Sequence, residues 1–367
     1  MQLNSAFYHM MSGNIASGNK AAVFTAVAVV AVSSVYLLWR RVKARVMSGA
    51  VVRVDSLYIY PVKSCAEQSV DTAIPTLRGF EGDRTLQVVD ANGKYCTPRD
   101  KDKSKLFHVT VELWGSNKLI FKSPYVEDIL EIDLDDNKAA SVKVDVLEAP
   151  EKLTLIDYGN DVAAWLEKAT GIKGCRLTGI GDEYERTSLV NNDQGDAIPT
   201  SDGKAPVSLA DEAPYLLVNQ ASLTDLNRRL HARGKPPVDM RRFRPNIVVS
   251  GGNLKPWEED TLKRIKIRNV EFYVWQRCGR CIMTTINRDT LERGPEPLAT
   301  LSEFRERAHG MRNFGMHLIP VKETILRTTT TDPDDAGDDA PTISVDDEVE
   351  ILERDEERVK EWEKLFG

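Results

Sequence analysis

One strand-like run and the residues directly after it constrain this chain most. Residues 270–275 are β-rich, with alternate apolar side chains on one face of the predicted strand. Residues 277–281 read Arg-Cys-Gly-Arg-Cys, and residues 282–285 look extended. Gly279 would permit a tight reversal between the two cysteines. The segment therefore predicts a turn that presents a thiolate at a strand end, where the flanking Arg277 and Arg280 would lower the pKa of the thiol.

Three interpretations of this cysteine pair remain open. A structural zinc site needs four ligands, commonly from a second paired element, and the other cysteines, Cys65, Cys96 and Cys175, are single and far apart. A thioredoxin-like pair would open a helix after a strand, whereas residues 282–285 look extended. The segment thus carries a reactive thiol, a thiolate ligand for a soft metal, or an inert buried cysteine.

Composition indicates an ordinary globular protein with an acidic end. The 367 residues exceed one average domain and can bury a sizeable core. The net charge is -7, and the acidic excess lies in the last forty residues, so that the remainder is slightly basic. An odd number of cysteines without framework spacing indicates a reducing compartment. No basic, aromatic-studded stripe indicates nucleic-acid binding.

Residues 21–39 form an uncharged, apolar run that follows an N-terminal tail, residues 1–20. The run has about the length that spans the hydrocarbon core of a bilayer as a helix. It ends in Trp39, and a basic linker, residues 40–50, follows. A cleaved signal peptide would have a shorter apolar core and a small-x-small site. We therefore expect a retained membrane anchor with the carboxy-terminal body in the cytosol, at the mitochondrial outer membrane or, alternatively, the endoplasmic reticulum.

The rest of the chain reads as many short strands with few helices. Strand-like runs occupy residues 51–60, 86–89, 108–113, 118–121, 142–147, 245–290 and 343–352. Helices are expected at 161–169, with Gly171 just past the end, from Ser222, and at 353–366. Residues 328–341 are polar and acidic, which is typical of a loop or a disordered insertion. The pattern predicts an α+β protein with β-barrel-like cores.

Four motifs besides the cysteine segment agree in order and spacing with one known family. They are Tyr58 to Cys65, Gly82 to Arg84, Phe243 to Val248, and Glu296 to Leu301. From about Val54 to about Leu352 the chain resembles the MOSC family, named for the C-terminal domain of molybdenum cofactor sulfurase. Within that family it is most similar to the amidoxime-reducing components of mitochondria.

The resemblance implies a two-part α+β fold behind the transmembrane helix. An amino-terminal β-rich subdomain would span residues 51–185, and a MOSC β-barrel domain would span residues 186–353, with the acidic insertion at 328–342. The charged helix that the sequence pattern itself predicts would follow, at residues 354–367. The family holds a molybdenum cofactor between the two parts.

The resemblance also nominates site residues for Mo-molybdopterin, which needs a soft anionic metal ligand, cations for its phosphate and hydrogen-bond donors along the pterin. In the family the metal ligand is the second cysteine of the turn, which matches Cys281, so that Cys278 would be a bystander. The other nominated cofactor contacts are Lys63, Ser64, Arg84, Asp211, Glu212, Ala213, Arg244, Asn246, Gly279 and Arg280. Close relatives carry hydroxyl residues at two of the positions 211–213, so only backbone contacts are carried over there.

Plainer interpretations exist for several of these residues. Lys63 could be a solvated surface lysine, and Arg84 could form a salt bridge to Asp83 or Glu81 at the rim. The five histidines, His317 among them, show no metal-ligand spacing, and we expect each to be a surface or core residue. The carboxylates offer no acid/base pair, which fits chemistry done at a metal.

The implied function is molybdenum-dependent reduction of N-hydroxylated compounds such as amidoximes and hydroxylamines. The chain shows no GxGxxG fingerprint and no Cys-x-x-Cys-His haem motif, so electrons would come from partners. By resemblance these are NADH-cytochrome b5 reductase and cytochrome b5. Two rival functions remain open. The first is that of a molybdenum cofactor carrier or sulfur-handling MOSC protein, and the second is that of a membrane scaffold that docks through its acidic tail.

Overall fold

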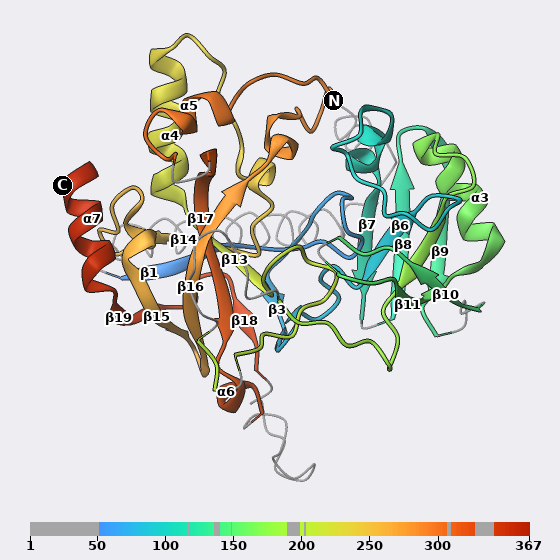
Figure 1. The fold of residues 1–367 in the computed structure, drawn as a ribbon, viewed down its shortest axis with the longest axis horizontal. Coiled ribbons are helices and arrows are strands. Elements are labelled where there is room, and N and C mark those ends of the chain that lie inside the picture. Colours follow the sequence, from blue (N-terminus) through green and yellow to red (C-terminus); the bar gives the residue numbers. More distant parts are fainter. Residues whose placement is uncertain are drawn as a thin grey trace, which may run out of the picture. The chain divides into compact units, whose positions relative to one another are not determined.

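Strands with alternating apolar residues build one eight-stranded sheet (Figure 1). Its strands, in spatial order, are β19 (Val349–Arg354), β15 (Leu262–Ile267), β16 (Val270–Arg280), β17 (Arg312–Pro320), β13 (Tyr215–Asn219), β14 (Ile247–Gly251), β1 (Val52–Ile59) and β2 (Gln68–Val70). Neighbours β13 and β14 run parallel, whereas β1 and β14, like β16 and β17, run antiparallel. The alternation of residues 270–274 puts Val270, Phe272 and Val274 into the core, as the sequence predicts.

This computed structural model describes residues 51–115, 117–135, 140–147, 149–188, 199–201, 203–306, 310–326 and 341–367. The expected anchor at 21–39, its basic linker and all but the last two residues of the insertion at 328–342 lie outside these ranges. Within the described part of the chain, no helix combines the length and the apolar character that crossing a bilayer requires.

The eight-stranded sheet curls until its far strands meet. The backbone N–H of Val54 in β1 donates to the carbonyl oxygen of Asp347 at 2.9 Å, and the N–H of Asp346 donates to Val54 at 2.9 Å. Residues 346–347 lie just before β19, the opposite edge strand, with only Glu348 between. The expected β-barrel is therefore a curled, partly closed sheet, which leaves fewer unpaired edge groups than a flat one.

A second β-rich region lies within residues 86–179. It holds a four-stranded sheet and a three-stranded meander, beside the helix α3 (Gly159–Thr170) and the 3₁₀ helix η1 (Lys101–His108). The four strands are β10 (Ala140–Val144), β11 (Leu153–Asp157), β12 (Arg176–Gly179) and β6 (Leu86–Val89), and the meander is β7 (Thr110–Trp114), β8 (Lys118–Ser123) and β9 (Val126–Asp133). Gly171 ends α3 in the left-handed conformation, φ 76°, as the sequence predicts. Trp165 of α3 packs against Phe121 of β8.

Shorter elements complete the described structure. Two small pairings join β3 (Thr72–Ala73) to β18 (Ile343–Ser344) and β4 (Pro75–Thr76) to β5 (Gly79–Phe80). The remaining helices are α4 (Gln220–Ala232), α5 (Leu298–Ser302), α6 (Lys322–Leu326), α7 (Glu356–Phe366), η2 (Met240–Phe243), η3 (Glu258–Thr261) and η4 (Ile282–Thr285). Leu226 of α4 and Leu301 of α5 share one core with Val248 and Phe314, so these helices cover the sheet at β14 and β17.

The cysteine segment differs from its prediction. β16 continues through Cys278 to Arg280, with Gly279 paired to Asn313, and residues 282–285 form the 3₁₀ helix η4 instead of a strand. Gly279 does not adopt a positive φ, so it makes no tight turn. A Cβ at Gly279 would lie 2.0 Å from Cε of Met311. Glycine thus leaves room for the end of a neighbouring side chain that approaches closely, and the predicted turn is wrong.

Candidate functional site

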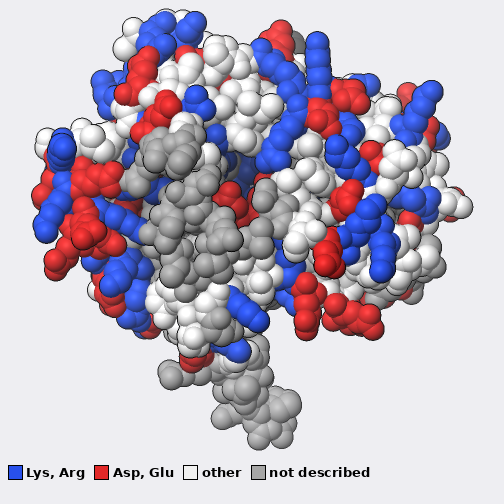
Figure 2. Space-filling model, viewed as in Figure 1, with Lys and Arg blue, Asp and Glu red and all other residues white. Residues whose placement is uncertain are grey.

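All eleven residues nominated from the sequence line one cavity of about 250 Å³. They are Lys63, Ser64, Arg84, Asp211, Glu212, Ala213, Arg244, Asn246, Gly279, Arg280 and Cys281. They come from segments spread over more than two hundred residues of sequence. Figure 2 shows that cationic and anionic side chains alternate over the face it presents, without a large area of one sign.

Three of these residues hold a backbone conformation that side chains other than glycine rarely adopt. The φ angles of Ser64, Arg84 and Arg244 are 71°, 51° and 54°. Such left-handed residues cost of order 1–3 kcal/mol each and persist only where the surroundings impose them. Their convergence on one cavity shows that the local fold is arranged to aim these side chains.

Tyr60 contacts both cavity arginines through its ring. The guanidinium carbon of Arg84 is 4.4 Å from the ring centroid, and that of Arg244 is 4.2 Å from it. The ring is fully buried and its hydroxyl donates to the carbonyl oxygen of Pro245 at 3.1 Å. The aromatic ring therefore holds two cations side by side that would otherwise repel each other.

Arg84 pairs with Asp83 at 2.6 Å, as the plainer interpretation had it, but Asp83 is buried and the side chain of Arg84 is only 12% exposed, so the pair does not lie at an open rim. Arg84 also donates to Oδ1 of Asn246 at 3.3 Å and to the carbonyl oxygen of Arg244 at 3.1 Å. Nδ2 of Asn246 donates to the carbonyl oxygen of Tyr58 at 3.2 Å. These bonds hold the motifs around residues 60, 84 and 245 together.

One nitrogen of the Arg244 guanidinium makes no hydrogen bond to the described residues. Its Nη1 donates to the carbonyl oxygen of Cys65 at 2.7 Å, whereas its buried Nη2 has no hydrogen-bond partner among the described residues. Burial, together with the charge of Arg288, lowers the pKa of Arg244 to about 10. Buried donors are rarely left without a partner, so this atom is the clearest indication that the cavity receives an acceptor group.

Lys63 is buried, so the solvated-surface interpretation is wrong. Its ammonium lies 2.7 Å from Oδ1 of Asp211 and donates to the carbonyl oxygen of Leu209 at 2.6 Å. Nη2 of Arg99 lies 3.2 Å from the other carboxylate oxygen. Burial by itself would raise the pKa of Asp211, but the charges of Lys63 and Arg99 outweigh it and hold that pKa well below its usual range.

The structure adds cavity or supporting residues that sequence reasoning missed, chiefly Tyr60, Arg99, Arg186 and His317. Arg186 donates to the carbonyl oxygens of Ser208, Ala210 and Asp211 and so fixes the backbone of that loop. Only Tyr60 lay inside a recognised motif. The other three are isolated in sequence, and their spacing carries no signal.

The two cysteines of the segment differ in environment. Cys281 is exposed in the cavity, where its charge would raise the pKa of Arg99, whereas Cys278 is buried and receives a hydrogen bond from Arg280. All five cysteines lie in the described ranges, and Cys281 is the one that is exposed. Of the three interpretations left open, an inert buried cysteine therefore does not describe Cys281.

Arg277 was expected to lie beside a cysteine thiol and lower its pKa, but its side chain points elsewhere. Successive strand residues point to opposite faces, so Arg277 of β16 points away from the side that carries Cys278. Its Nε lies 2.6 Å from Oδ2 of Asp260, and its Nη2 lies 3.0 Å from Glu361.

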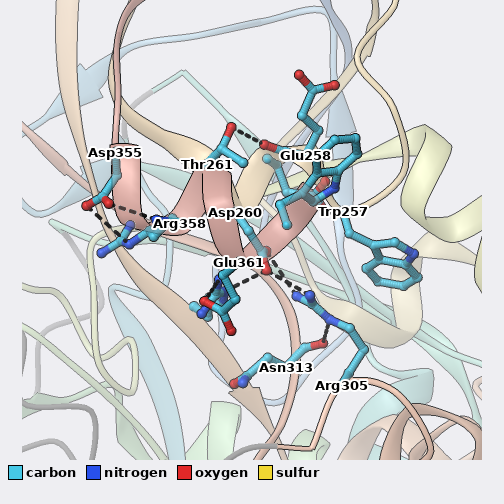
Figure 3. A network of polar contacts seen from close by, with 12 residues as sticks. Trp257, Glu258, Asp260, Thr261, Arg305, Asn313, Asp355, Arg358 and Glu361 are labelled. Atoms are coloured by element: carbon cyan, nitrogen blue, oxygen red, sulfur yellow. Dashed lines mark hydrogen bonds and ion pairs between the residues drawn. The ribbon is translucent and has the colours of Figure 1, made fainter. Parts of the chain in front are cut away.

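A buried polar network behind β16 holds this strand in place (Figure 3). Asp260 of η3 also accepts from Nη1 of Arg305 at 2.7 Å and from Nη2 at 3.0 Å. Arg358 of α7 donates to the carbonyl oxygen of Trp275 at 2.8 Å. The C-terminal helix therefore clamps the strand that leads to the cavity cysteines.

The donor set fits a molybdenum cofactor. Cys281 supplies an exposed soft sulfur, and Arg244, Arg84 and Lys63 supply cationic donors from three segments. The orphaned Nη2 of Arg244 is a donor of the kind that a phosphate or a pterin oxygen would satisfy.

Comparison with known proteins agrees with this fold. The MOSC N-terminal beta barrel domain matches residues 51–173, and the MOSC domain matches residues 204–350. The chain belongs to the MOSC domain family.

Two kinds of relative are similar over most of the chain. Mitochondrial amidoxime reducing component 2 of Macaca fascicularis is 33% identical over 277 residues, which cover 73% of this chain and 77% of that protein. Molybdenum cofactor sulfurase of Solanum lycopersicum is 30% identical over 75% of this chain but only 34% of its own length. The chain thus spans about a third of the sulfurase.

Proposed function

We propose that this protein is a molybdenum-cofactor-dependent reductase of N-hydroxylated compounds. The observation that carries the proposal is the exposed Cys281 in a cavity whose other walls hold Lys63, Arg84 and Arg244. The similarity to a protein named as an amidoxime-reducing component over 77% of its length supports the same reaction.

The residues have separate roles in this proposal. Cys281 would hold the metal, and the cofactor would supply the two-electron chemistry at the N–O bond. Arg244, Arg84 and Lys63 would bind its anionic groups, and Asn246 would face the pterin edge. Tyr60 and Arg186 would position these groups without touching the substrate, because both are engaged with the protein backbone.

Electrons would come from NADH through cytochrome b5 reductase and cytochrome b5. The relative's name places it in mitochondria, and the uncharged run at 21–39 would tether this chain to the outer mitochondrial membrane. Tethering to a membrane that carries the partners would raise their effective concentration.

A cofactor carrier or sulfur-handling protein is the second candidate. The observation in its favour is the 30% identity to a molybdenum cofactor sulfurase, of which this chain matches 34%. A carrier would bind and release the cofactor, whereas a reductase would retain it through many turnovers.

One assay separates the two functions. The full chain, purified in detergent, is analysed for molybdenum and pterin and then incubated with benzamidoxime, NADH, cytochrome b5 and its reductase. A reductase contains about one molybdenum per chain and forms benzamidine over many turnovers. A chain that contains molybdenum but forms no benzamidine, with the partners shown to be active, would support the carrier instead.

A further inference from the structure

One wall of the cavity carries three titratable side chains, those of Glu212, His317 and Cys278, to which the proposed cofactor binding gives no role. Oε2 of Glu212 lies 3.5 Å from Nδ1 of His317 and accepts from Nε2 of Gln276 at 3.3 Å. Gln276 of β16 is paired with His317 of β17, and Cys278 follows Gln276 by two residues, so that the thiol and the imidazole lie on the same cavity wall and shift each other's pKa. All four residues are adjacent in space, and Glu212, His317 and Cys278 line the cavity.

The cluster runs from solvent to the buried cavity wall. The side chain of Glu212 is 42% exposed, whereas that of His317 is 8% exposed and Cys278 is buried. The carboxylate thus contacts water at one end, and the sulfur reaches the cavity at the other. A carboxylate beside an imidazole beside a thiol is an arrangement that passes protons between its members.

Electrostatics favour a proton on the imidazole. Burial would raise the pKa of Cys278, but the charges of Arg280 and His317 outweigh it and lower that pKa. Burial would likewise lower the pKa of His317. The charges of Cys278 and Glu212 outweigh this effect and raise that pKa, although the charge of Arg280 opposes them. Arg280, Glu212, Cys278 and His317 are the charged or titratable groups of this cluster, and together they favour a thiolate beside an imidazolium.

We propose that Glu212, His317 and Cys278 form a proton-transfer chain that delivers protons to a substrate held in this cavity. The inference rests on the proposed reduction. That reaction breaks the N–O bond of R–NH–OH, takes up two electrons and two protons, and yields R–NH₂ and water. One proton goes to the departing oxygen and one to nitrogen, and a one-electron donor such as a reduced viologen supplies the electrons.

The first test concerns the thiolate and needs no turnover. Full-length protein in detergent is alkylated with iodoacetamide from pH 5.5 to 9, and each cysteine is quantified by peptide mass spectrometry. Cys278 should react at a lower pH than a free thiol does, and His317→Gln should slow this reaction at least tenfold and move its midpoint to higher pH. Cys65 and Cys96 serve as internal controls, because burial raises the pKa of each to about 12. If Cys278 gave the same profile in the wild type and in His317→Gln, the proposed proton-transfer chain would be overturned.

The second test measures protons during turnover with reduced viologen and benzamidoxime. His317→Gln and Cys278→Ala should lower kcat at least tenfold at pH 8, and their rates should fall steadily from pH 6 to 8. The wild-type rate should instead hold until the pH passes the raised pKa of His317. Cys278→Ser should keep much of the activity, because a hydroxyl still passes a proton, and added imidazole should partly restore His317→Gln.

Molybdenum content must match in all proteins, which separates proton transfer from cofactor loss. If His317→Gln and Cys278→Ala both kept the wild-type kcat across this pH range, the proposed proton-transfer chain would be overturned, and the proposed reductase function would still stand. If fully molybdenum-loaded wild-type protein reduced no substrate, both the proposed function and the proposed proton-transfer chain would be overturned. The alkylation profiles would still report whether the thiolate–imidazolium pair exists.

Discussion

The ammonium of Lys63 lies 2.7 Å from the carboxylate of Asp211, and this pair joins the first cavity motif to the loop that precedes β13. Lys63 is buried, whereas the side chain of Asp211 is 41% exposed. The pair therefore connects segments far apart in sequence at the edge of the cavity.

Asp211→Asn should destabilise the protein because it leaves Lys63 buried without its counter-charge. Removing one partner of a fully buried pair costs about 3–5 kcal/mol, and the partial exposure of Asp211 reduces our expectation to about 1–3 kcal/mol. Urea unfolding at pH 7 measures the difference.

The stability difference between wild type and Asp211→Asn should also depend on pH. A carboxyl group with a depressed folded-state pKa stabilises the protein above its unfolded-state pKa of about 3.9, and the contribution is lost as the pH falls through the folded-state pKa. The gap between wild type and Asp211→Asn should therefore be complete at pH 6 and shrink below about pH 4. A gap that stays constant down to pH 2.5 would contradict the ion pair.

The two cavity cysteines should respond differently to serine. Cys281→Ser should abolish molybdenum-dependent reduction in a folded protein, because a hydroxyl poorly replaces a soft thiolate. Cys278→Ser should keep much of the activity. Molybdenum content, circular dichroism and benzamidoxime reduction measure the effect, and equal losses in both variants would refute the assignment of Cys281 as the ligand.

Arg244→Ala should weaken cofactor retention about ten- to a hundredfold. The reason is the loss of charge-assisted hydrogen bonds worth very roughly 1.5 to 3 kcal/mol. Arg228→Ala is the matched control, since that arginine is 69% exposed and pairs only with Asp225 among the ion pairs of the described residues. Molybdenum occupancy after extended dialysis is the readout, and wild-type occupancy in Arg244→Ala would remove this residue from the site.

Gly279→Ala should push Met311 out of its position, because the new Cβ would lie 2.0 Å from Cε of Met311. A flexible methionine end can move, so we expect a stability loss of about 1 kcal/mol or less but reduced cofactor content. Gly279→Ala combined with Met311→Ala should recover the cofactor content. No recovery in the double variant would show that Gly279 is needed for another reason.

Deletion of residues 1–45 should give a soluble, cofactor-loaded and active protein, because no nominated site residue lies there. Carbonate extraction of membranes from cells that express either form is the measurement. The full chain should stay with the membrane pellet. Pelleting of the truncated form as well would show that residues 21–39 are not the sole anchor.

Sequence reasoning reached the α+β class, the strand at 270–274, the end of α3 at Gly171 and a set of cavity residues. Alternation and helix-stop residues are local signals, so they could be read without the fold. The cavity residues came from motif resemblance and not from any local rule. The turn at Gly279 was misread, because a glycine that relieves a contact with Met311 looks the same in sequence as a glycine that turns the chain.

The sequence by itself determined which residue types were available: a paired cysteine segment, three separated cationic motifs and an uncharged run near the amino terminus. Only the tertiary structure decided that Arg277 faces Asp260 while Cys278 faces the cavity, and that Cys281 is exposed whereas Cys278 is buried. It also brought Glu212 and His317 together, two residues that sequence analysis had not linked. The physical reason is that burial, pKa and partner choice depend on strand pairing between distant segments, and a bulge or a one-residue shift in register reverses which face a side chain occupies.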